Sequence, residues 1–393
     1  MKKILHSERI PIKLWLHDIE SGAMNQAVNL ANLPFAFKHI VILPDCHQGY
    51  GMPIGGVLAT QGVVIPNAVG VDIGCGMSAV RTSLHNIEMN KLSVIMSDIR
   101  NLVPLGFKHH SKAQDPERMP AVAGENLRIA ELTVVSREYA SALHQLGTLG
   151  GGNHFIEIQK GSDGFIWIMV HSGSRNIGKQ VADHYNRLAM RLNDKWGEPE
   201  FRKKQLAYLP ENSDEGIIYW YEMQFCIDFA FANRQLMIEN IISVFRNEFG
   251  EKIEFAPMIN IAHNYASREN HFGEQVIVHR KGATQAKKDQ TGIIPGSQGT
   301  RSYIVRGKGN KESFESCSHG AGRVMGRKQA QRSLDLAGEI KALDMKNILH
   351  SLRSKKDLDE APTAYKDINE VMRNQADLVE IVVELSPLAV IKG

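Results

Sequence analysis

Five short glycine-rich blocks constrain this chain more than any other feature, because each places metal-binding or nucleophilic side chains beside small residues. They are DIGCG at 72–76, GGGNHFIE at 150–157, VHSGSR at 170–175, NIAHNY at 260–265 and SCSHGAGR at 316–323. Glycine lets the backbone approach a ligand closely and adopt conformations closed to other residues. Because the blocks are spread over about 250 residues, the sequence predicts one site assembled from the whole chain.

The composition is that of a soluble globular protein, with 43% apolar and 23% charged residues. The 393 residues suffice for one large domain or two ordinary ones, and the net charge of +3 is too small to indicate nucleic-acid binding by itself. The four cysteines lack the spacing of a disulfide framework. No segment has the roughly 18 uninterrupted apolar residues of a membrane span. We therefore expect a cytoplasmic protein with no membrane partner.

Apolar, β-rich runs that end in polar residues occur at four places, and each predicts a buried strand that delivers a side chain to a cleft. The delivered residues are Asp45, His171, His279 and Arg306. Apolar residues at helical spacing or good helix formers predict helices over 179–194, 221–247 and 323–353, with polar loops at 111–126 and 354–364. The chemical motifs run from residue 44 to the C-terminus without a boundary, which favours one domain over residues 1–393.

A metal centre is predicted around Asp72 and Cys75, which lie three residues apart in a glycine-rich turn. A thiolate with a carboxylate can bridge two divalent ions, and His154, His171 and His263 are candidates to complete each shell. This mixed ligand set does not select zinc over manganese, iron or cobalt. The paired cysteines of a closed structural zinc site are missing, which favours an open, catalytic centre. For any single histidine, the alternative is a hydrogen-bonded core residue.

A nucleophile is predicted at His319, whose neighbours Ser318 and Gly320 leave its ring accessible. An imidazole nitrogen can attack phosphorus and form a phosphoramidate, provided that a carboxylate such as that of Asp45 orients the ring. The chain lacks a GxxxxGK[ST] phosphate loop. Glycine and serine in 294–303 and 316–323 could hold a nucleotide instead. A metal ligand or a structural histidine are the other interpretations of His319.

These blocks, together with PDCHQGYG at 44–51, PGSQG at 295–299 and VIKG at 390–393, closely resemble the RtcB family of RNA-splicing ligases over nearly the full length. The resemblance implies an α+β, single-domain fold with mixed sheets around a central dinuclear metal cleft. It also implies an enzyme that joins an RNA 3′-phosphate or 2′,3′-cyclic phosphate to a 5′-hydroxyl, using GTP and two Mn²⁺ ions.

The resemblance carries roles over to individual residues. Asp72, Cys75 and His154 would hold one manganese, and Cys75, His171 and His263 the second. His319 would be guanylylated, with Asp45 orienting its ring. Tyr365 resembles an aromatic position near the guanine. The GTP contacts implied in the same way are Asn153, His154, Phe155, Ile156, Glu157, His263, Asn264, Pro295, Gly296, Ser297, Gln298, Ser302, His319, Gly320, Ala321, Gly322, Tyr365 and Lys392.

With this family likeness, the basic residues are expected to hold RNA and triphosphate oxygens; they are Arg280, Lys281, Arg301, Arg306 and Arg323. A monomer is expected, and the need for an archease-like helper stays open, as does the choice between tRNA splicing and repair of tRNA or ribosomal RNA. Two residues depart from the family pattern. Gln298 stands where methionine is common, and we expect it only to modify a nucleotide contact. Cys46 stands where valine is common, and we interpret its thiol as a small hydrophobic residue rather than a spare metal ligand.

Two other functions remain open on the residues alone. A dinuclear phosphoesterase would open cyclic phosphates without GTP and without ligation. A metal-stabilised, non-catalytic RNA-binding subunit of a repair complex would use the same ligand set for stability.

Overall fold

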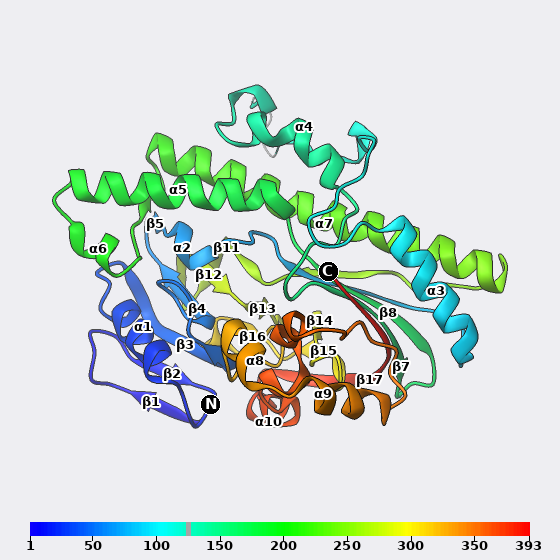
Figure 1. Cartoon of the computed structure of the whole chain (residues 1–393). Helices are drawn as coiled ribbons and strands as arrows, with labels where there is room; N and C mark the ends of the chain where they lie inside the picture. The colour runs from blue at the N-terminus through cyan, green and yellow to red at the C-terminus, as the bar shows by residue number, and fades with distance from the viewer. Residues whose placement is uncertain (123–126) are drawn as a thin grey trace.

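The computed structural model describes residues 1–122 and 127–393, which form two β-sheets with two long helices packed across them (Figure 1). Helix α5 (Arg175–Lys195) packs against α7 (Asp214–Phe249), and α7 also covers strands of the larger sheet. The helices expected over 179–194 and 221–247 are therefore confirmed.

The smaller of the two sheets has six strands in the order β1-β2-β3-β4-β12-β11. Their bounds are Lys3–Leu5, Ile12–Leu14, Ala36–His47, Ile54–Thr60, Glu274–Lys281 and Asn264–His271. β2 and β3 pair in parallel, because helix α1 (Ser21–Ala31) crosses over between them, whereas the other pairs are antiparallel. This sheet is mixed, as expected.

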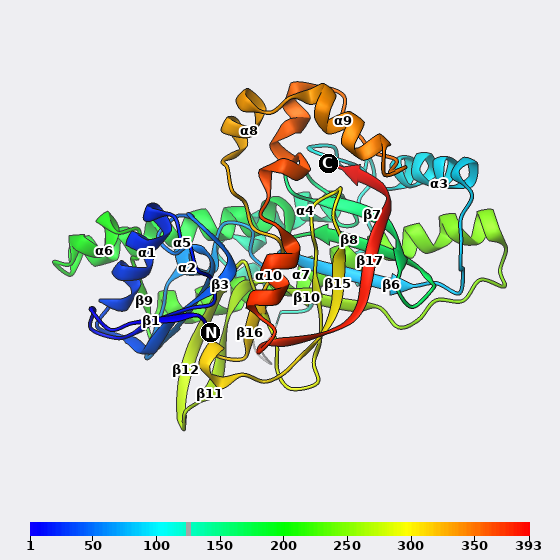
Figure 2. The same ribbon diagram turned by 90° about the horizontal axis from the view of Figure 1, so that it is seen from below.

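The larger sheet has seven antiparallel strands in the order β10-β6-β8-β7-β17-β15-β14. Their bounds are Ile259–Ala262, Gly76–Arg81, Ile166–Ser172, Phe155–Gly161, Val379–Lys392, Ser302–Gly307 and Thr291–Ile294. Figure 2 shows the C-terminal strand β17 lying beside β7 and β15. The α+β expectation is confirmed, although mixed pairing among these two sheets is confined to the six-stranded one.

The remaining elements are short. Two small antiparallel pairs join β13 (Ala283–Gln285) to β16 (Ser316–Ser318) and β5 (Val63–Val64) to β9 (Leu209–Pro210). The other α-helices in the described residues are α2 (Pro66–Val69), α3 (Met89–Leu102), α4 (Val135–Gln145), α6 (Pro199–Lys203), α8 (Arg327–Ser333), α9 (Leu336–Asp344) and α10 (Ile368–Asn374). In the described residues, no helix combines the length and apolar character that a membrane crossing needs.

Helix α7 owes its 36 residues to a defined start and a buried face. The hydroxyl of Ser213 accepts a hydrogen bond from the Gly216 amide, and Asp214 and Glu215 stand in the positively polarised first turn. Gly250 ends the helix with a φ of 84°, which favours glycine. Both α5 and α7 bury apolar side chains against each other, and each large one stabilises the fold by about 1.5–3 kcal/mol.

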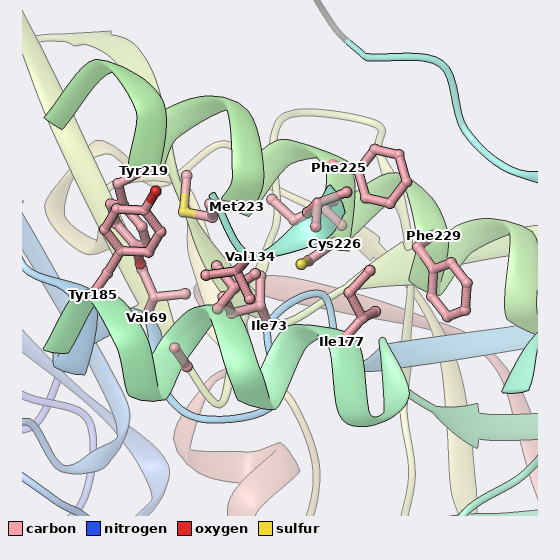
Figure 3. Packing of buried hydrophobic residues seen from close by; sticks show 14 of the residues in the cluster. Val69, Ile73, Val134, Ile177, Tyr185, Tyr219, Met223, Phe225, Cys226 and Phe229 are labelled. Atoms are coloured by element: carbon pink, nitrogen blue, oxygen red, sulfur yellow. The ribbon is translucent and has the colours of Figure 1, made fainter. Parts of the chain in front are cut away.

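The core between α5 and α7 also holds the turn that carries Asp72 and Cys75. Figure 3 shows Ile73 among Ile177 of α5 and Cys226 of α7, and its side chain is fully buried. Burial of this one apolar residue between the two candidate metal ligands fixes the turn against the helices. The apolar core thereby positions the site.

Two sequence-based expectations are wrong. Residues 323–353 do not form one helix, because the carboxylate of Asp335 accepts hydrogen bonds from the amides of Ala337 and Gly338 and starts α9 afresh after α8. Of the four strand-end residues, His279 lies in the core, where its Nε2 accepts a hydrogen bond from the Ile65 amide, and Arg306 is an exposed residue of β15. Part of the loop predicted at 111–126 falls outside the described residues, at 123–126.

Candidate functional site

Five side chains from distant parts of the chain converge into two triads that share one sulfur. Asp72, Cys75 and His154 form the first triad, and Cys75, His171 and His263 form the second. Within each triad, the potential ligand atoms all lie within 4.8 Å of one another. The five residues expected around Asp72 and Cys75 therefore lie together in the structure.

The strand order explains how these residues meet. β6 follows Cys75, β7 follows His154 and β8 contains His171, and these three strands are neighbours in the seven-stranded sheet, with Phe155 opposite His171. His263 lies where the chain leaves β10 in this sheet and enters β11 in the six-stranded sheet. The site therefore lies at the junction of the two sheets.

The turn at Cys75 is held from beneath by helix α7. Arg234 is fully buried and donates hydrogen bonds of 2.9 Å to the carbonyl oxygens of Gly74 and Ser172. Gly74 has a φ of 73°, and a Cβ on it would lie 2.8 Å from the Cα of Ile227. A side chain at this position would push the turn away from the helix, so glycine is required.

Backbone carbonyls fix which imidazole nitrogen faces the cluster. The Nδ1 atoms of His154 and His171 lie 2.9 Å and 3.0 Å from the carbonyl oxygens of Leu149 and Asn153. A carbonyl can only accept, so each Nδ1 carries the proton and each Nε2 presents a lone pair. Burial, followed by the neighbouring histidines, lowers the pKa of His171, which keeps this imidazole neutral and able to bind a metal.

The donor set fits a pair of divalent cations. Sγ of Cys75 lies 3.5 Å from Nε2 of His154 and 3.3 Å from Nε2 of His171, and Nε2 of His171 lies 3.4 Å from Nε2 of His263. Neutral imidazoles that aim lone pairs at one another in a buried site repel, and a cation between them removes that repulsion. Burial raises the pKa of Asp72, but His154, Cys75 and the charge of Arg175 together outweigh burial and bring the pKa to about 2.

Asp45 and His319 form a dyad next to this cluster. Oδ2 of Asp45 lies 2.6 Å from Nδ1 of His319 and also accepts hydrogen bonds from the backbone amides of His319 and Gly320, at 3.0 Å and 3.4 Å. Burial alone would raise the pKa of Asp45, but the bond and charge of His319 lower it, so the carboxylate is ionised at neutral pH. Nε2 of His319 is left as the reactive nitrogen, and this ring lies 4.8 Å from that of His263.

Two cavities open from this dyad, and His319 lines both. The smaller has a volume of about 200 Å³ and is enclosed by the 295–298 and 319–323 loops and by Lys392; it is named the nucleotide pocket after the GTP contacts expected of its residues. The larger, the open cleft, has a volume of about 840 Å³ and reaches Asp72, Cys75 and Lys281. A group attached to His319 could therefore be exchanged between molecules in the two cavities.

Most residues expected to contact GTP line the nucleotide pocket. These are Asn153, Phe155, Glu157, Pro295, Gly296, Ser297, Gln298, His319, Gly320, Ala321, Gly322, Tyr365 and Lys392. His263 and Asn264 line the open cleft instead, and His154 belongs to the metal cluster. Ile156 packs in the apolar core, because it alternates with Phe155 along β7, and Ser302 lies behind the pocket, where its hydroxyl accepts from the Gly296 amide.

Sequence reasoning missed the acidic centre of the nucleotide pocket, Glu360. This buried carboxylate lies 3.1 Å from Arg323 and 3.3 Å from both Arg327 and Lys392, and it accepts a hydrogen bond from the Tyr365 hydroxyl. Burial would raise its pKa, but these cations, Lys392 first, lower it. Glu360 lies in a segment interpreted as a polar loop, so no periodic pattern marked it.

His47 was also missed, although it stands in the PDCHQGYG motif. It lines both cavities, and its Nδ1 lies 3.1 Å from the carbonyl oxygen of Asp45. Burial lowers its pKa to about 4, so the ring is neutral. Its position two residues after Asp45 on the same strand was the available signal, because such residues share one face.

The expected phosphate-binding role is wrong for Arg280 and is not supported by the positions of Arg301 and Arg306. Arg280 is fully buried and pairs with Glu269, while Arg301 pairs with Glu384, 2.9 Å away, and Arg306 lines neither cavity. Alternation along β12 sends Arg280 inward and Lys281 to the open cleft. Among the five, Lys281 and Arg323 line the cavities.

The two departures from the family pattern have distinct surroundings. Cys46 is buried in an apolar cluster with Met52 and Leu58, and burial raises the pKa of its thiol, as suits a small hydrophobic residue. The Gln298 side chain lines the nucleotide pocket and donates a 2.9 Å hydrogen bond to the carbonyl oxygen of Glu360. Gln298 therefore ties the 295–298 loop to the acidic centre.

Comparison with known proteins identifies the family. Residues 26–393 match the family model described as tRNA-splicing ligase RtcB. The chain belongs to the RtcB family. It is 39% identical to the RNA-splicing ligase RtcB of Escherichia coli K12, across 100% of this chain and 99% of the relative. It is 33% identical to the tRNA-splicing ligase RtcB of Thermococcus kodakarensis, across 95% and 92%. The resemblance seen in the motifs is confirmed, and the matched residues include both triads and the dyad.

Proposed function

We propose that this chain is an RNA ligase that joins an RNA 3′-phosphate, or a 2′,3′-cyclic phosphate after its opening, to a 5′-hydroxyl end, at the expense of GTP. The observation that carries this proposal is that His319, oriented by Asp45, stands between a nucleotide pocket and an open cleft, beside a two-triad metal cluster. The names of the relatives support RNA as the substrate.

In the first step, the lone pair on Nε2 of His319 forms a bond to the α-phosphorus of GTP, and the bond from that phosphorus to the bridging oxygen breaks. Pyrophosphate leaves, and GMP remains on the ring. Asp45 keeps the Nδ1 proton in place, which orients Nε2 and stabilises the positive charge that the ring gains. Asp45 therefore acts as the orienting group.

In the second step, an oxygen of the RNA 3′-phosphate attacks the same phosphorus, and the bond to Nε2 breaks. GMP is now linked to the RNA end through a pyrophosphate. The 5′-hydroxyl of the other strand then attacks the RNA phosphorus, GMP departs and a phosphodiester remains. Because His319 lines both cavities, GMP can reach the RNA without leaving the site.

We propose two Mn²⁺ ions as the metals, one on each triad, with Cys75 shared. Bound there, the ions supply positive charge that offsets the negative charge of the reacting phosphates. Lys392, Arg323 and Arg327 border the nucleotide pocket and could bind phosphate oxygens, while Glu157 and Tyr365 in its wall are proposed to contact the guanine.

The cellular setting is proposed from the same residues. The four cysteines are free and buried, which suits a reducing compartment such as the cytoplasm. Intron-split tRNA and cleaved tRNA or ribosomal RNA carry the proposed ends. A monomeric state and assistance from an archease-like helper stay predictions.

Incubation with GTP labelled at the α-phosphorus and with Mn²⁺ tests the proposal. A covalent adduct that is stable to alkali and labile to acid is expected for the wild type and for His17→Ala, a variant of an exposed histidine, and none for His319→Ala. A labelled adduct that persists in His319→Ala contradicts the proposal. Opening of a 2′,3′-cyclic phosphate without GTP and without joined product would instead favour a dinuclear phosphoesterase.

A further inference from the structure

Three exposed apolar side chains, one aromatic and two aliphatic, lie at the edge of the open cleft and are not part of the buried core. Tyr50, Val71 and Val324 all line it, and they are 69%, 43% and 56% exposed. Exposed apolar side chains that gather at one cavity commonly mark a binding site. Tyr50 is the aromatic member and the most exposed of the three.

The loop that carries Tyr50 is held by hydrogen bonds on both sides. The Gln26 side chain donates to the carbonyl oxygen of Gly49 at 2.6 Å and accepts from its amide at 3.1 Å. The Gly51 amide donates to Oε1 of Gln205 at 3.0 Å. Nζ of Lys281, which is 7% exposed, donates to the carbonyl oxygen of Tyr50 at 2.6 Å. The backbone is therefore fixed while the side chain stays in solvent.

The same cleft is lined by the exposed basic residues Arg327 and Lys328 and by Arg323; the two arginines also pair with Glu360. A groove that combines cationic side chains with an exposed aromatic ring is typical of single-stranded nucleic-acid binding, because phosphates meet the cations and bases stack on the ring. In duplex RNA each base is held in its pair and only the terminal pair has an open face, whereas an unpaired nucleotide can turn its base onto the ring. The combination favours an unpaired nucleotide.

We propose that Tyr50 is a stacking platform for an unpaired nucleobase of the RNA end that enters the open cleft, and that the site takes single-stranded rather than blunt, fully paired ends. This inference rests on the proposed ligase function and names its substrate class. Tyr50 acts as a positioning residue: stacking holds the RNA so that its terminal phosphate reaches His319. Nucleotides of the 3′-phosphate strand and of the 5′-hydroxyl strand present the same kind of base face, and the test below distinguishes the two strands.

The test combines a protein variant with a chemical change in the RNA. Binding of single-stranded RNA is measured by fluorescence anisotropy for the wild type, Tyr50→Ala and Tyr50→Phe, using RNA with a normal or an abasic terminal nucleotide. Separate RNAs carry the abasic residue on the 3′-phosphate strand or on the 5′-hydroxyl strand, which identifies the stacked strand. Base–aromatic stacking predicts about 10-fold weaker binding or more for Tyr50→Ala, and near wild-type binding for Tyr50→Phe.

The decisive result is that the effects of Tyr50→Ala and of the abasic nucleotide on RNA binding do not add. The abasic end should weaken wild-type binding on one strand and should leave Tyr50→Ala unaffected, since the stacking partner is already absent. Trp196→Ala removes an aromatic side chain that is 42% exposed and lines neither cavity, and it should bind both RNAs like the wild type. Thermal unfolding checks that every variant is folded.

Equal binding by Tyr50→Ala and the wild type overturns the platform, as does an abasic effect of the same size in both. Tighter binding of blunt duplex ends than of single-stranded ends overturns the substrate class. If the wild type joins RNA in the presence of GTP while the abasic effect is missing, only this inference fails. If the wild type neither binds nor joins RNA, the proposed function itself fails.

Discussion

Oδ2 of Asp45 lies 2.6 Å from Nδ1 of His319, although 274 residues separate the two along the chain. Asp45 lies on β3 of the six-stranded sheet. His319 directly follows β16, and the fold brings its imidazole next to the Asp45 carboxylate. The bond decides which nitrogen of His319 can react. The proposed guanylylation therefore depends on the orientation of this one ring.

Asp45→Asn should slow formation of the GMP adduct by about 10²–10⁴-fold, because a neutral amide neither fixes the Nδ1 proton nor stabilises the charged ring. Single-turnover kinetics with labelled GTP measure the rate. Asp377→Asn, a change at an exposed carboxylate that contacts the N-terminus, serves as the control. An Asp45→Asn variant that reacts at the wild-type rate would remove the orienting role.

Cys75→Ala should lower manganese affinity at both positions, because its sulfur belongs to both triads, whereas Asp72→Asn should weaken only one. Loss of a direct ligand should cost more than roughly 100-fold in affinity, since even outer partners of a metal site contribute 10–100-fold. Calorimetric titration with Mn²⁺ gives the stoichiometry. Cys46→Ala alters a buried thiol outside both triads and should keep two ions; equal loss in Cys46→Ala would contradict the assignment.

Gly282→Ala should slow guanylylation by about 10²-fold, because a Cβ at this position would lie 2.3 Å from Cγ2 of Ile54 and 3.0 Å from Cε1 of His319, so that both side chains would have to shift. Gly273→Ala is the matched control. Both glycines have positive φ, 59° and 87°, so each variant carries roughly 1–2 kcal/mol of backbone strain, but a Cβ on Gly273 meets no atom of the described residues within 4 Å. Equal rates for the two variants would show that backbone strain alone acts.

Glu157→Gln should become more stabilising, relative to the wild type, as the pH rises from about 4.5 to about 8. Burial raises the pKa of Glu157 to about 8, against an ordinary value of 4.5. In this window the folded state holds a proton that the unfolded state has released, so the contribution of Glu157 to stability falls as the pH rises. Urea unfolding of both proteins at pH 5 and pH 8 measures the difference, and a constant difference would show that the carboxyl is not desolvated.

The types of residue in the motifs could be predicted from the sequence, and so could the strands that carry Asp45 and His171. Buried strands and amphipathic helices are predicted from local periodicity, and each short motif shows directly which thiolate, imidazole or carboxylate it contributes. The division of the five ligands into two triads came from the family likeness of these blocks. The structure groups them in the same way.

Other features could not be read from the chain. Arg280 and Lys281 are adjacent basic residues, yet one is buried against Glu269 and the other reaches the open cleft. Glu360 stands in a segment without periodicity and becomes the partner of three cations. Alternation along a strand shows that neighbours face opposite ways, but which face is the core depends on what packs against the sheet.

The sequence by itself determined the chemistry of this protein, because the donor and nucleophile types, and the glycines beside them, are local properties of the chain. Only the tertiary structure decided their arrangement: which imidazole nitrogen faces the shared sulfur, how the apolar core holds Ile73 between two ligands, and that His319 borders two cavities. These depend on contacts between residues up to hundreds of positions apart, which form only when the two sheets meet beside α7.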